Sequence, residues 1–190
     1  MVCQIADIDR ARVRDAVECC APAGTRPEEL EAQRANSEGW LLQILTEWSP
    51  CGKLAYVEGK VKGLILYLPA ALFTGRSLCR AYQENPVECP ASWAERGMVF
   101  VVCLWAKTEG CGIGGALLRA MLENLGRPRQ FRGSPGSEVG VMVFNPTERI
   151  HWPAGPADFY RSFGFVVERS DPATGRVWLT RPVSPCRPLE

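Results

Sequence analysis

The hydrophobic positions of the chain follow a helical period in several segments. Apolar residues recur three and four positions apart over residues 7–20, 28–48 and 113–125, which predicts three amphipathic helices. A fourth, short helix is predicted over residues 156–163, because a proline opens this segment and Gly164 closes it.

Other segments carry the continuous or alternating apolar residues that are typical of strands. Residues 53–69 predict a β-hairpin, with strands at 54–57 and 61–68 and a two-residue turn at Gly59-Lys60. Residues 98–105 are almost entirely apolar, as expected for a strand that is covered on both faces. The remaining strands are predicted at residues 138–145, 165–168 and 177–180.

The order of these elements predicts an α/β (α+β) fold, in which helices flank a central mixed sheet. The 190 residues are close to the usual size of one domain, so we expect a single domain over residues 1–190. A connection from about Arg76 to Gly97 shows no clear periodicity, and a connection of that length is usually functional.

Charge and hydropathy exclude several classes of protein. The chain has 22 Lys+Arg and 21 Asp+Glu, a net charge of +1, which argues against a nucleic-acid binder or a polybasic membrane anchor. The longest apolar runs, residues 63–73 and 98–106, fall short of the roughly 20 residues that cross a bilayer. The N-terminal residues lack the apolar core of a signal peptide, so we expect a cytoplasmic protein.

The nine cysteines are an odd number and form no C-x-x-C pair, which favours reduced thiols over a disulfide framework. His151 is the single histidine of the chain. With these ligands and spacings we expect no metal site.

The segment VFVVCLW-AKTE-GCGIGG-ALLRAMLENL joins a buried strand to a helix through a glycine-rich turn at residues 107–115. Glycines permit positive φ and a close approach of the backbone to a ligand. The start of the helix presents free N–H groups and the positive end of its dipole, so we expect an anion, and in particular a phosphate, as the ligand.

Three interpretations of this turn compete. Residues 110–115 satisfy the dinucleotide-binding pattern G-x-G-x-x-G, but three polar residues separate them from the strand and only 75 residues follow, too few for a doubly wound domain. A nucleotide P-loop is excluded, because no G-x-x-x-x-G-K-[ST] occurs. A structural turn without a ligand is the third interpretation.

A second motif, ADFYRSFGF at residues 157–165, favours a ligand-binding interpretation of the glycine turn over a purely structural one. Together the two motifs resemble the GCN5-related N-acetyltransferase (GNAT) family. In that family a Q/R-x-x-G-x-G/A turn binds the pyrophosphate of acetyl-CoA, and a helix with a Tyr-x-x-x-Gly-Phe pattern places a tyrosine beside the CoA sulfur. Residues 109–114 match the first pattern and residues 160–165 match the second, and the element order matches over nearly the whole chain.

The resemblance implies the GNAT fold, with a mostly antiparallel sheet, and the use of acetyl-CoA as cosubstrate without a metal. It implies acetyl-CoA contacts along the strand, around the glycine turn and at the second motif. The residues concerned are Cys103, Leu104, Trp105, Glu109, Gly110, Cys111, Gly112, Ile113, Gly114, Gly115, Asn145 and Tyr160.

Three features depart from the family pattern. Glu109 stands where the family has Arg or Gln, and a carboxylate beside a pyrophosphate is repulsive. The loop AKTE before the glycines is shorter than usual. Between Asn145 and Tyr160 the chain inserts residues 146–156, which we expect near the acyl-transfer centre.

The resemblance also implies the chemistry, in which an amine attacks the thioester directly while backbone N–H groups of residues 101–105 polarise the acetyl oxygen. Tyr160 is the expected general acid for the CoA thiolate, and His151 is the expected base. A bound water could equally remove the proton, and Glu88, Glu95 and Glu148 are weaker candidates. Two further alternatives remain open: Cys103 as a nucleophile, with ping-pong kinetics, and Cys111 as a redox-sensitive thiol.

We therefore expect an N-acetyltransferase that acts on a small-molecule or peptide amine of unknown identity, with neither nucleic acid nor membrane as partner. A homodimer is compatible with the resemblance. The alternative is a non-catalytic acyl-CoA-binding or regulatory domain on the same fold, which Glu109 and the short loop favour.

Overall fold

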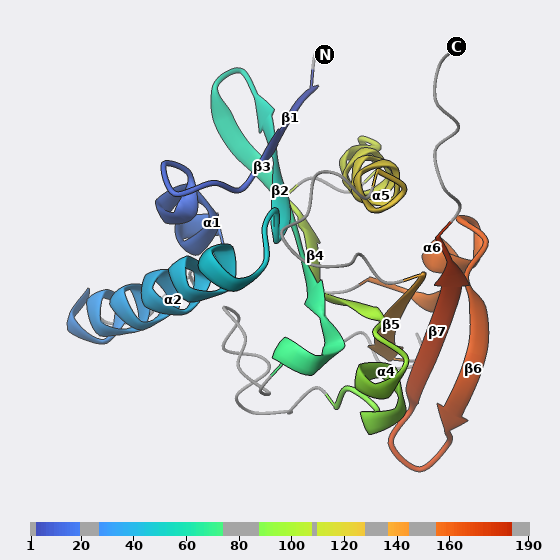
Figure 1. Ribbon diagram of the computed structural model, residues 1–190. Coiled ribbons are helices and arrows are strands. Elements are labelled where there is room, and N and C mark those ends of the chain that lie inside the picture. Colours follow the sequence, from blue (N-terminus) through green and yellow to red (C-terminus); the bar gives the residue numbers. More distant parts are fainter. Residues whose placement is uncertain are drawn as a thin grey trace.

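The computed structural model describes residues 3–19, 27–73, 88–107, 110–127, 137–144 and 155–183. They form a seven-stranded sheet in the order β1-β2-β3-β4-β5-β7-β6 (Figure 1). Only the β4–β5 pair is parallel among these described strands, which confirms the predicted mixed, mostly antiparallel sheet. The strands are β1 (Cys3–Asp7), β2 (Gly52–Val57), β3 (Lys60–Pro69), β4 (Val99–Ala106), β5 (Glu138–Phe144), β6 (Val166–Asp171) and β7 (Arg176–Pro182).

Helices cover both faces of this sheet. In Figure 1, α1 and α2 lie to one side of the β1–β4 part, and α5 lies to the other. None of the helices in the described ranges combines the length and the apolar character that a membrane span needs. The helices are α1 (Val13–Cys19), α2 (Pro27–Glu47), α4 (Ala91–Glu95), α5 (Ile113–Leu125) and α6 (Ala157–Arg161), together with the 3-10 turn η1 (Ala70–Leu72).

The N-terminal prediction is partly wrong. The helix expected over residues 7–20 is confined to α1, and the residues before it form β1, which pairs with β2 along its whole length. The backbone N–H of Arg12 donates to Asp9 Oδ1 at 3.0 Å, so a side-chain turn separates strand from helix. The short edge strand carries only one large aliphatic residue, Ile5, which is too weak a pattern to predict it.

The β2–β3 hairpin is confirmed, but its turn lies one residue earlier than predicted. Val57 pairs with Lys60, so the turn residues are Glu58 and Gly59. Both have positive φ, 52° and 72°, as a tight hairpin turn that follows the twist of the strands requires.

A helix forms inside the connection expected to be irregular. α4 begins after Pro90 and ends before Gly97, whose φ is 65°. Its one buried residue is Trp93. Residues 74–87 of this connection lie outside the described residues.

The other predicted elements are confirmed with small shifts at their ends. β4 is buried over its first six residues, as its continuous apolar sequence predicts. The apolar side of α5 packs on β3, where Gly63 permits the close approach: a Cβ at this position would lie 2.7 Å from Ile113. Leu117 and Met121 are fully buried in that contact, and complete burial of such a side chain stabilises the fold by roughly 2 kcal/mol.

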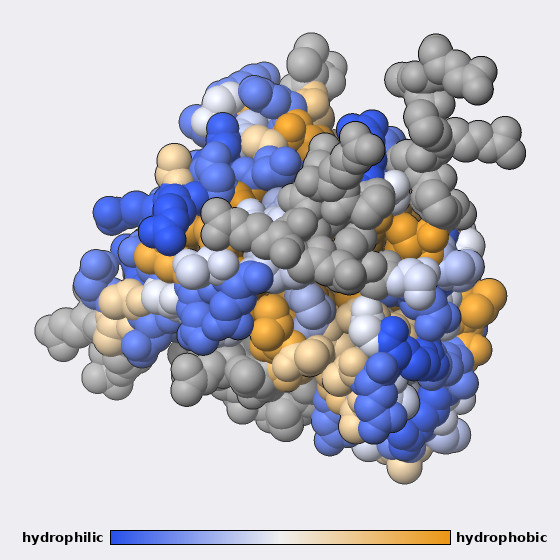
Figure 2. All heavy atoms as spheres, viewed as in Figure 1, coloured by the Kyte–Doolittle hydropathy of each residue, from blue (hydrophilic) through white to orange (hydrophobic). Residues whose placement is uncertain are grey.

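The face of the molecule shown in Figure 2 is mainly polar over its described residues. Figure 2 shows hydrophilic residues over most of the coloured atoms on this face, with apolar residues in separate patches. Among the described residues, the exposed large hydrophobic side chains are Val166 and Val167 on β6, at 62% and 41% exposure. Both lie on a strand that forms one edge of the sheet.

Candidate functional site

The sheet opens between its two central parallel strands. Residues 99–101 of β4 pair with residues 139–141 of β5, and the described register between the two strands ends there. On the other side of β4, Leu66 pairs with Cys103 and Tyr67 with Val101, so Val102 forms a bulge at the point where β5 departs. We call β1–β4 with α4 and α5 the first half of the fold, and β5–β7 with α6 the second half.

Beyond the bulge, β4 has β3 as its neighbour while its other edge faces the opening. In a strand, every second residue directs its N–H and C=O away from a given neighbour. Residues 103–106 therefore offer backbone donors and acceptors toward the opening. Such an edge suits an extended ligand with amide groups of its own.

The glycine turn lies at the end of β4 and leads into α5. Gly110 and Gly112 have φ values of 74° and 73°, and Gly112 is the N-cap of the helix. A Cβ at either position would meet no atom within 4 Å, so glycine is required there by the backbone conformation rather than by lack of space.

The start of α5 presents free backbone donors. The first hydrogen bond of the helix joins the N–H of Ala116 to the carbonyl of Gly112 at 3.0 Å. The N–H groups of Ile113, Gly114 and Gly115 thus precede the hydrogen bonding of the helix itself, and Gly112 has no side chain to cap them. Together with the helix dipole, they form a suitable site for a phosphate group.

α6 packs directly on this first turn. A Cβ at Gly114 would lie 3.7 Å from Phe159, and one at Gly115 would lie 3.3 Å from Phe163. The two phenylalanine rings are 5.1 Å apart. Glycines at 114 and 115 therefore let α6 approach α5, which brings the second motif to the first.

Tyr160 lies in α6 and is completely buried. Its ring packs edge-on against Phe159 and Phe165, with centroids 5.2 and 5.3 Å away. Its hydroxyl has no hydrogen-bond partner among the described residues. Burial raises the pKa of this phenol well above its usual value, and the proximity of Cys103 raises it further, so the two side chains lie within electrostatic reach.

Arg119 is a residue of this region that sequence analysis missed. It lies one helical turn after Gly115, and its guanidinium nitrogens are 3.6 Å from the position of a Cβ on Gly115. The guanidinium also stacks over the ring of Phe163, 5.6 Å from its centroid. The signal in the sequence was a basic residue one turn after the glycines, on a helix whose apolar positions drew attention instead.

The structure places the remaining predicted residues as follows. Cys103 and Leu104 are buried in β4, Trp105 is half-buried at its end, and Cys111 is exposed in the glycine turn. Three predicted residues, Glu109, Asn145 and His151, lie outside the described residues, as does the weaker candidate Glu148.

Two weaker candidates for the base belong to another part of the fold. Glu95 is exposed on α4. Glu88 contacts Arg176 of β7, with 3.5 Å between Oε1 and Nη1. Within the described ranges, no three His, Cys, Asp or Glu side chains are grouped so that they could hold a metal ion.

The residues present fit an acyl-CoA molecule on structural grounds. Free N–H groups at α5 suit a pyrophosphate, the open edge of β4 suits the amides of pantetheine, and the orphaned hydroxyl of Tyr160 suits a sulfur or thiolate partner.

Comparison with known proteins agrees with this architecture. No protein-family model matches the sequence, and no curated protein matches it either. Solved structures do match. The PaiA N-acetyltransferase from Thermoplasma acidophilum, in complex with coenzyme A, has a TM-score of 0.55 at 12% identity and covers 96% of this chain and 99% of its own.

Two other matches cover as much. An N-acetyltransferase from Staphylococcus aureus Mu50 has a TM-score of 0.57 at 11% identity, over 97% of this chain and 100% of its own. A GNAT-family acetyltransferase from Streptococcus pneumoniae has a TM-score of 0.58 at 12% identity, over 96% and 100%. With the sheet order, the opening at β4–β5 and these neighbours, the chain has the fold of the GNAT N-acetyltransferases, as the two motifs predicted.

Proposed function

We propose that this chain transfers an acetyl group from acetyl-CoA to an amine. The observation that carries the proposal is the hydroxyl of Tyr160, which is fully buried, unpartnered within the described residues and within electrostatic reach of Cys103 on β4. A buried hydroxyl without a partner costs about 1–3 kcal/mol, and a ligand atom that pairs with it removes this cost.

The start of α5 binds the pyrophosphate in this proposal. The N–H groups of Ile113, Gly114 and Gly115 donate to phosphate oxygens, and Arg119 adds a positive charge one turn further along. This charge offsets the repulsion that a carboxylate at position 109 introduces. The edge of β4 beyond Val102 binds the pantetheine amides and polarises the acetyl carbonyl.

Tyr160 then serves as the general acid. Its raised pKa means that the phenol holds its proton throughout the neutral range, so it can donate to the sulfur as the carbon–sulfur bond breaks. The amine nitrogen forms the new bond to the acetyl carbon and releases a proton. We assign this proton to His151, or to a water in its place.

Cys103 provides an alternative route in which its sulfur accepts the acetyl group first. It is only 1% exposed in β4, and it lies within electrostatic reach of Tyr160. This route predicts ping-pong kinetics and an acetylated enzyme, whereas direct attack predicts a ternary complex. The direct route is our proposal, because burial leaves the thiol little room for a tetrahedral intermediate.

For the acceptor we propose a small-molecule or peptide amine, and for the compartment the cytoplasm. The odd number of cysteines and the lack of a C-x-x-C pair suit a reducing environment. The alternative function is a domain that binds acyl-CoA without turnover.

The test is thermal unfolding and calorimetry with acetyl-CoA, with NAD+ as the control ligand, followed by a screen of amines. At 100 times Kd, a ligand stabilises the fold by about 2.7 kcal/mol, which raises Tm by roughly 5–10 °C for a chain of this size. Stabilisation by acetyl-CoA with amine turnover supports the proposal. Binding without turnover on any amine supports the non-catalytic alternative, and stabilisation by NAD+ alone overturns both.

A further inference from the structure

The two halves of the fold are joined by a very short seam. Within the described part of the sheet it consists of three register pairs, Val99 with Val139, Phe100 with Gly140, and Val101 with Val141. The halves meet again where α6 packs on the start of α5. The angle between the halves therefore sets how the N–H groups of α5 lie relative to the hydroxyl of Tyr160.

Trp93 of α4 spans this seam. Its fully buried ring lies so close to Gly140 of β5 that a Cβ there would be 2.4 Å from it. The same ring lies 5.9 Å from Phe100 of β4. One side chain thus contacts the central pair of the seam from both strands, and it needs glycine at position 140 to do so.

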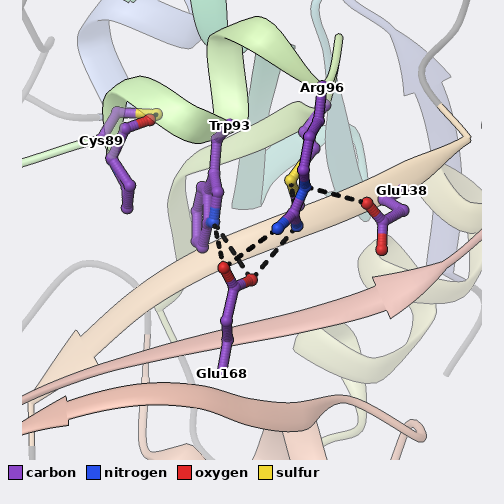
Figure 3. Close-up of polar contacts among 7 residues, drawn as sticks. Cys89, Trp93, Arg96, Glu138 and Glu168 are labelled. Carbon is purple, nitrogen blue, oxygen red and sulfur yellow. Dashed lines mark hydrogen bonds and ion pairs between the residues drawn. The ribbon is translucent and has the colours of Figure 1, made fainter.

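A carboxylate from the second half holds Trp93 in place. The indole Nε1–H of Trp93 donates to both oxygens of Glu168 on β6, at 3.3 and 3.2 Å (Figure 3). The register between β6 and β7 shifts between Val167 and Arg169, so Glu168 is the extra residue of a bulge. A bulge changes the direction of a side chain, and here Glu168 reaches α4.

Arg96 completes the arrangement. Its Nη1 and Nη2 donate to the two oxygens of Glu168 at 3.1 and 3.2 Å, while its Nε lies 3.2 Å from Glu138 Oε2 at the start of β5. Figure 3 shows the guanidinium between the two carboxylates. Two-point pairing of this kind fixes direction as well as distance, which a single charge contact does not.

We propose that Trp93, Arg96 and Glu168 are positioning residues, a seam clamp that fixes the angle between the two halves and so aligns the start of α5 with Tyr160. The inference rests on the proposed acetyl transfer. No residue of the clamp belongs to the residues assigned to acyl-CoA. The clamp acts through geometry, and a misplacement of about 1 Å at a reacting centre costs on the order of a hundredfold in rate.

The experiment compares variants of the clamp with a matched control. Glu168→Gln removes the two-point pairing, and Arg96→Lys keeps the charge but loses the fork. Asp171→Asn is the control, because Asp171 lies at the end of the same strand and accepts hydrogen bonds only near the β6–β7 turn, from Ala173 and Thr174. For each variant we would measure kcat, KM for acetyl-CoA, calorimetric Kd and Tm.

We expect both clamp variants to lose about tenfold or more in kcat at saturating substrates, while the control keeps the wild-type kcat. Gly140→Ala drives a methyl group into Trp93 and should lower kcat further. Pairing it with Trp93→Leu makes room again and should recover part of the loss. Clamp variants that lower Tm but keep kcat and KM within about twofold, less than 1 kcal/mol, would assign these residues a structural role only and overturn the proposal.

Hydrogen exchange separates failure of the clamp from failure of the proposed function. If the wild type binds no acetyl-CoA, the proposed function fails. The clamp then stands only if Glu168→Gln speeds amide exchange at residues 99–101 and 139–141 while α5 and β2 exchange as in the wild type. Equal exchange at the seam, or faster exchange everywhere, overturns it.

Discussion

Two carboxylates, Asp7 and Glu168, each organise a polar cluster, and the clusters differ in what they join. Asp7 Oδ1 accepts from Lys53 Nζ at 2.6 Å and from Asn124 Nδ2 at 3.1 Å. These residues belong to β1, β2 and α5, so this cluster lies wholly within the first half. Glu168 instead connects β6 of the second half with α4, across the seam.

The two clusters also differ in the solvent exposure of their cationic side chains, and this exposure determines how much stability is lost when the carboxylate is removed. The Lys53 side chain is only 6% exposed, whereas that of Arg96 is 39% exposed. An ammonium group that loses its partner inside the protein is strongly destabilising, but an exposed guanidinium that loses its partner returns to water at little cost. Loss of the Asp7 cluster should therefore cost more stability than loss of the Arg96–Glu168 pairing. Glu168 adds a smaller contribution to stability through the buried Nε1–H of Trp93.

The largest effect that separates the clusters should come from Asp7→Ala. Lys53 would remain buried without its partner, so we expect the free energy of unfolding to fall by about 3 kcal/mol and Tm by roughly 6–12 °C. Asp7→Asn, which keeps an oxygen acceptor, should lose less. Chemical denaturation measures both, and a loss below about 1 kcal/mol for Asp7→Ala would contradict this assignment.

Tyr160→Phe should show the opposite behaviour, with a large loss of activity and none of stability. We expect kcat to fall by about a hundredfold, because the general acid is gone. Tm should stay or rise, because the deleted hydroxyl had no partner among the described residues. Tyr67→Phe is the matched control: this phenol is equally buried, and its pKa is raised by burial and then by the charge of Asp7. Equal loss of kcat in both variants would remove Tyr160 from the mechanism.

Arg119→Gln tests the charge at the start of α5 and should have a smaller effect. We expect the Kd for acetyl-CoA to rise about tenfold, the value of one charge-assisted hydrogen bond, with little change in kcat. Arg127→Gln removes the same charge from beyond the other end of α5 and should leave Kd unchanged. A similar rise in both variants, measured by calorimetry, would mean that only net charge matters.

The smallest effect concerns the β2–β3 turn. Glu58 has a φ of 52°, a conformation that costs a residue with a Cβ about 1 kcal/mol. Glu58→Gly should therefore raise stability by roughly 0.5 kcal/mol after the entropy of glycine is counted, without a change in kcat. Lys60→Gly, beside the turn, should lower stability instead. A decrease in Tm for Glu58→Gly would show that this turn is not strained.

The sequence predicts well those parts of the fold that depend on local signals. The glycine turn, α5 and the ADFYRSFGF motif carry their information within about a dozen residues each, so these elements were predictable from periodicity and glycines. The candidate acyl-CoA site itself was expected only from the resemblance of the two motifs to the GNAT family. β1 was missed because its pairing depends on β2, far along the chain, and not on its own weak pattern.

The seam clamp could not be predicted from local sequence patterns. Trp93 and Glu168 are 75 positions apart, and Glu168 meets Trp93 only because a bulge redirects it. Gly140 is unremarkable in sequence, and its role emerges only when the indole ring lies upon it. Arg119 was overlooked for a similar reason, since its proximity to the start of α5 depends on how its side chain folds back along the helix.

The short seam also has a consequence for the order in which the chain folds. The β2–β3 hairpin closes through a two-residue turn, whereas the pairing of Val99 with Val139 closes a loop of 40 positions. Contacts between distant residues form late because chain entropy must be lost first. The joining of β4 to β5 should therefore follow the folding transition state, and a weakened clamp should accelerate unfolding while the refolding rate stays nearly constant.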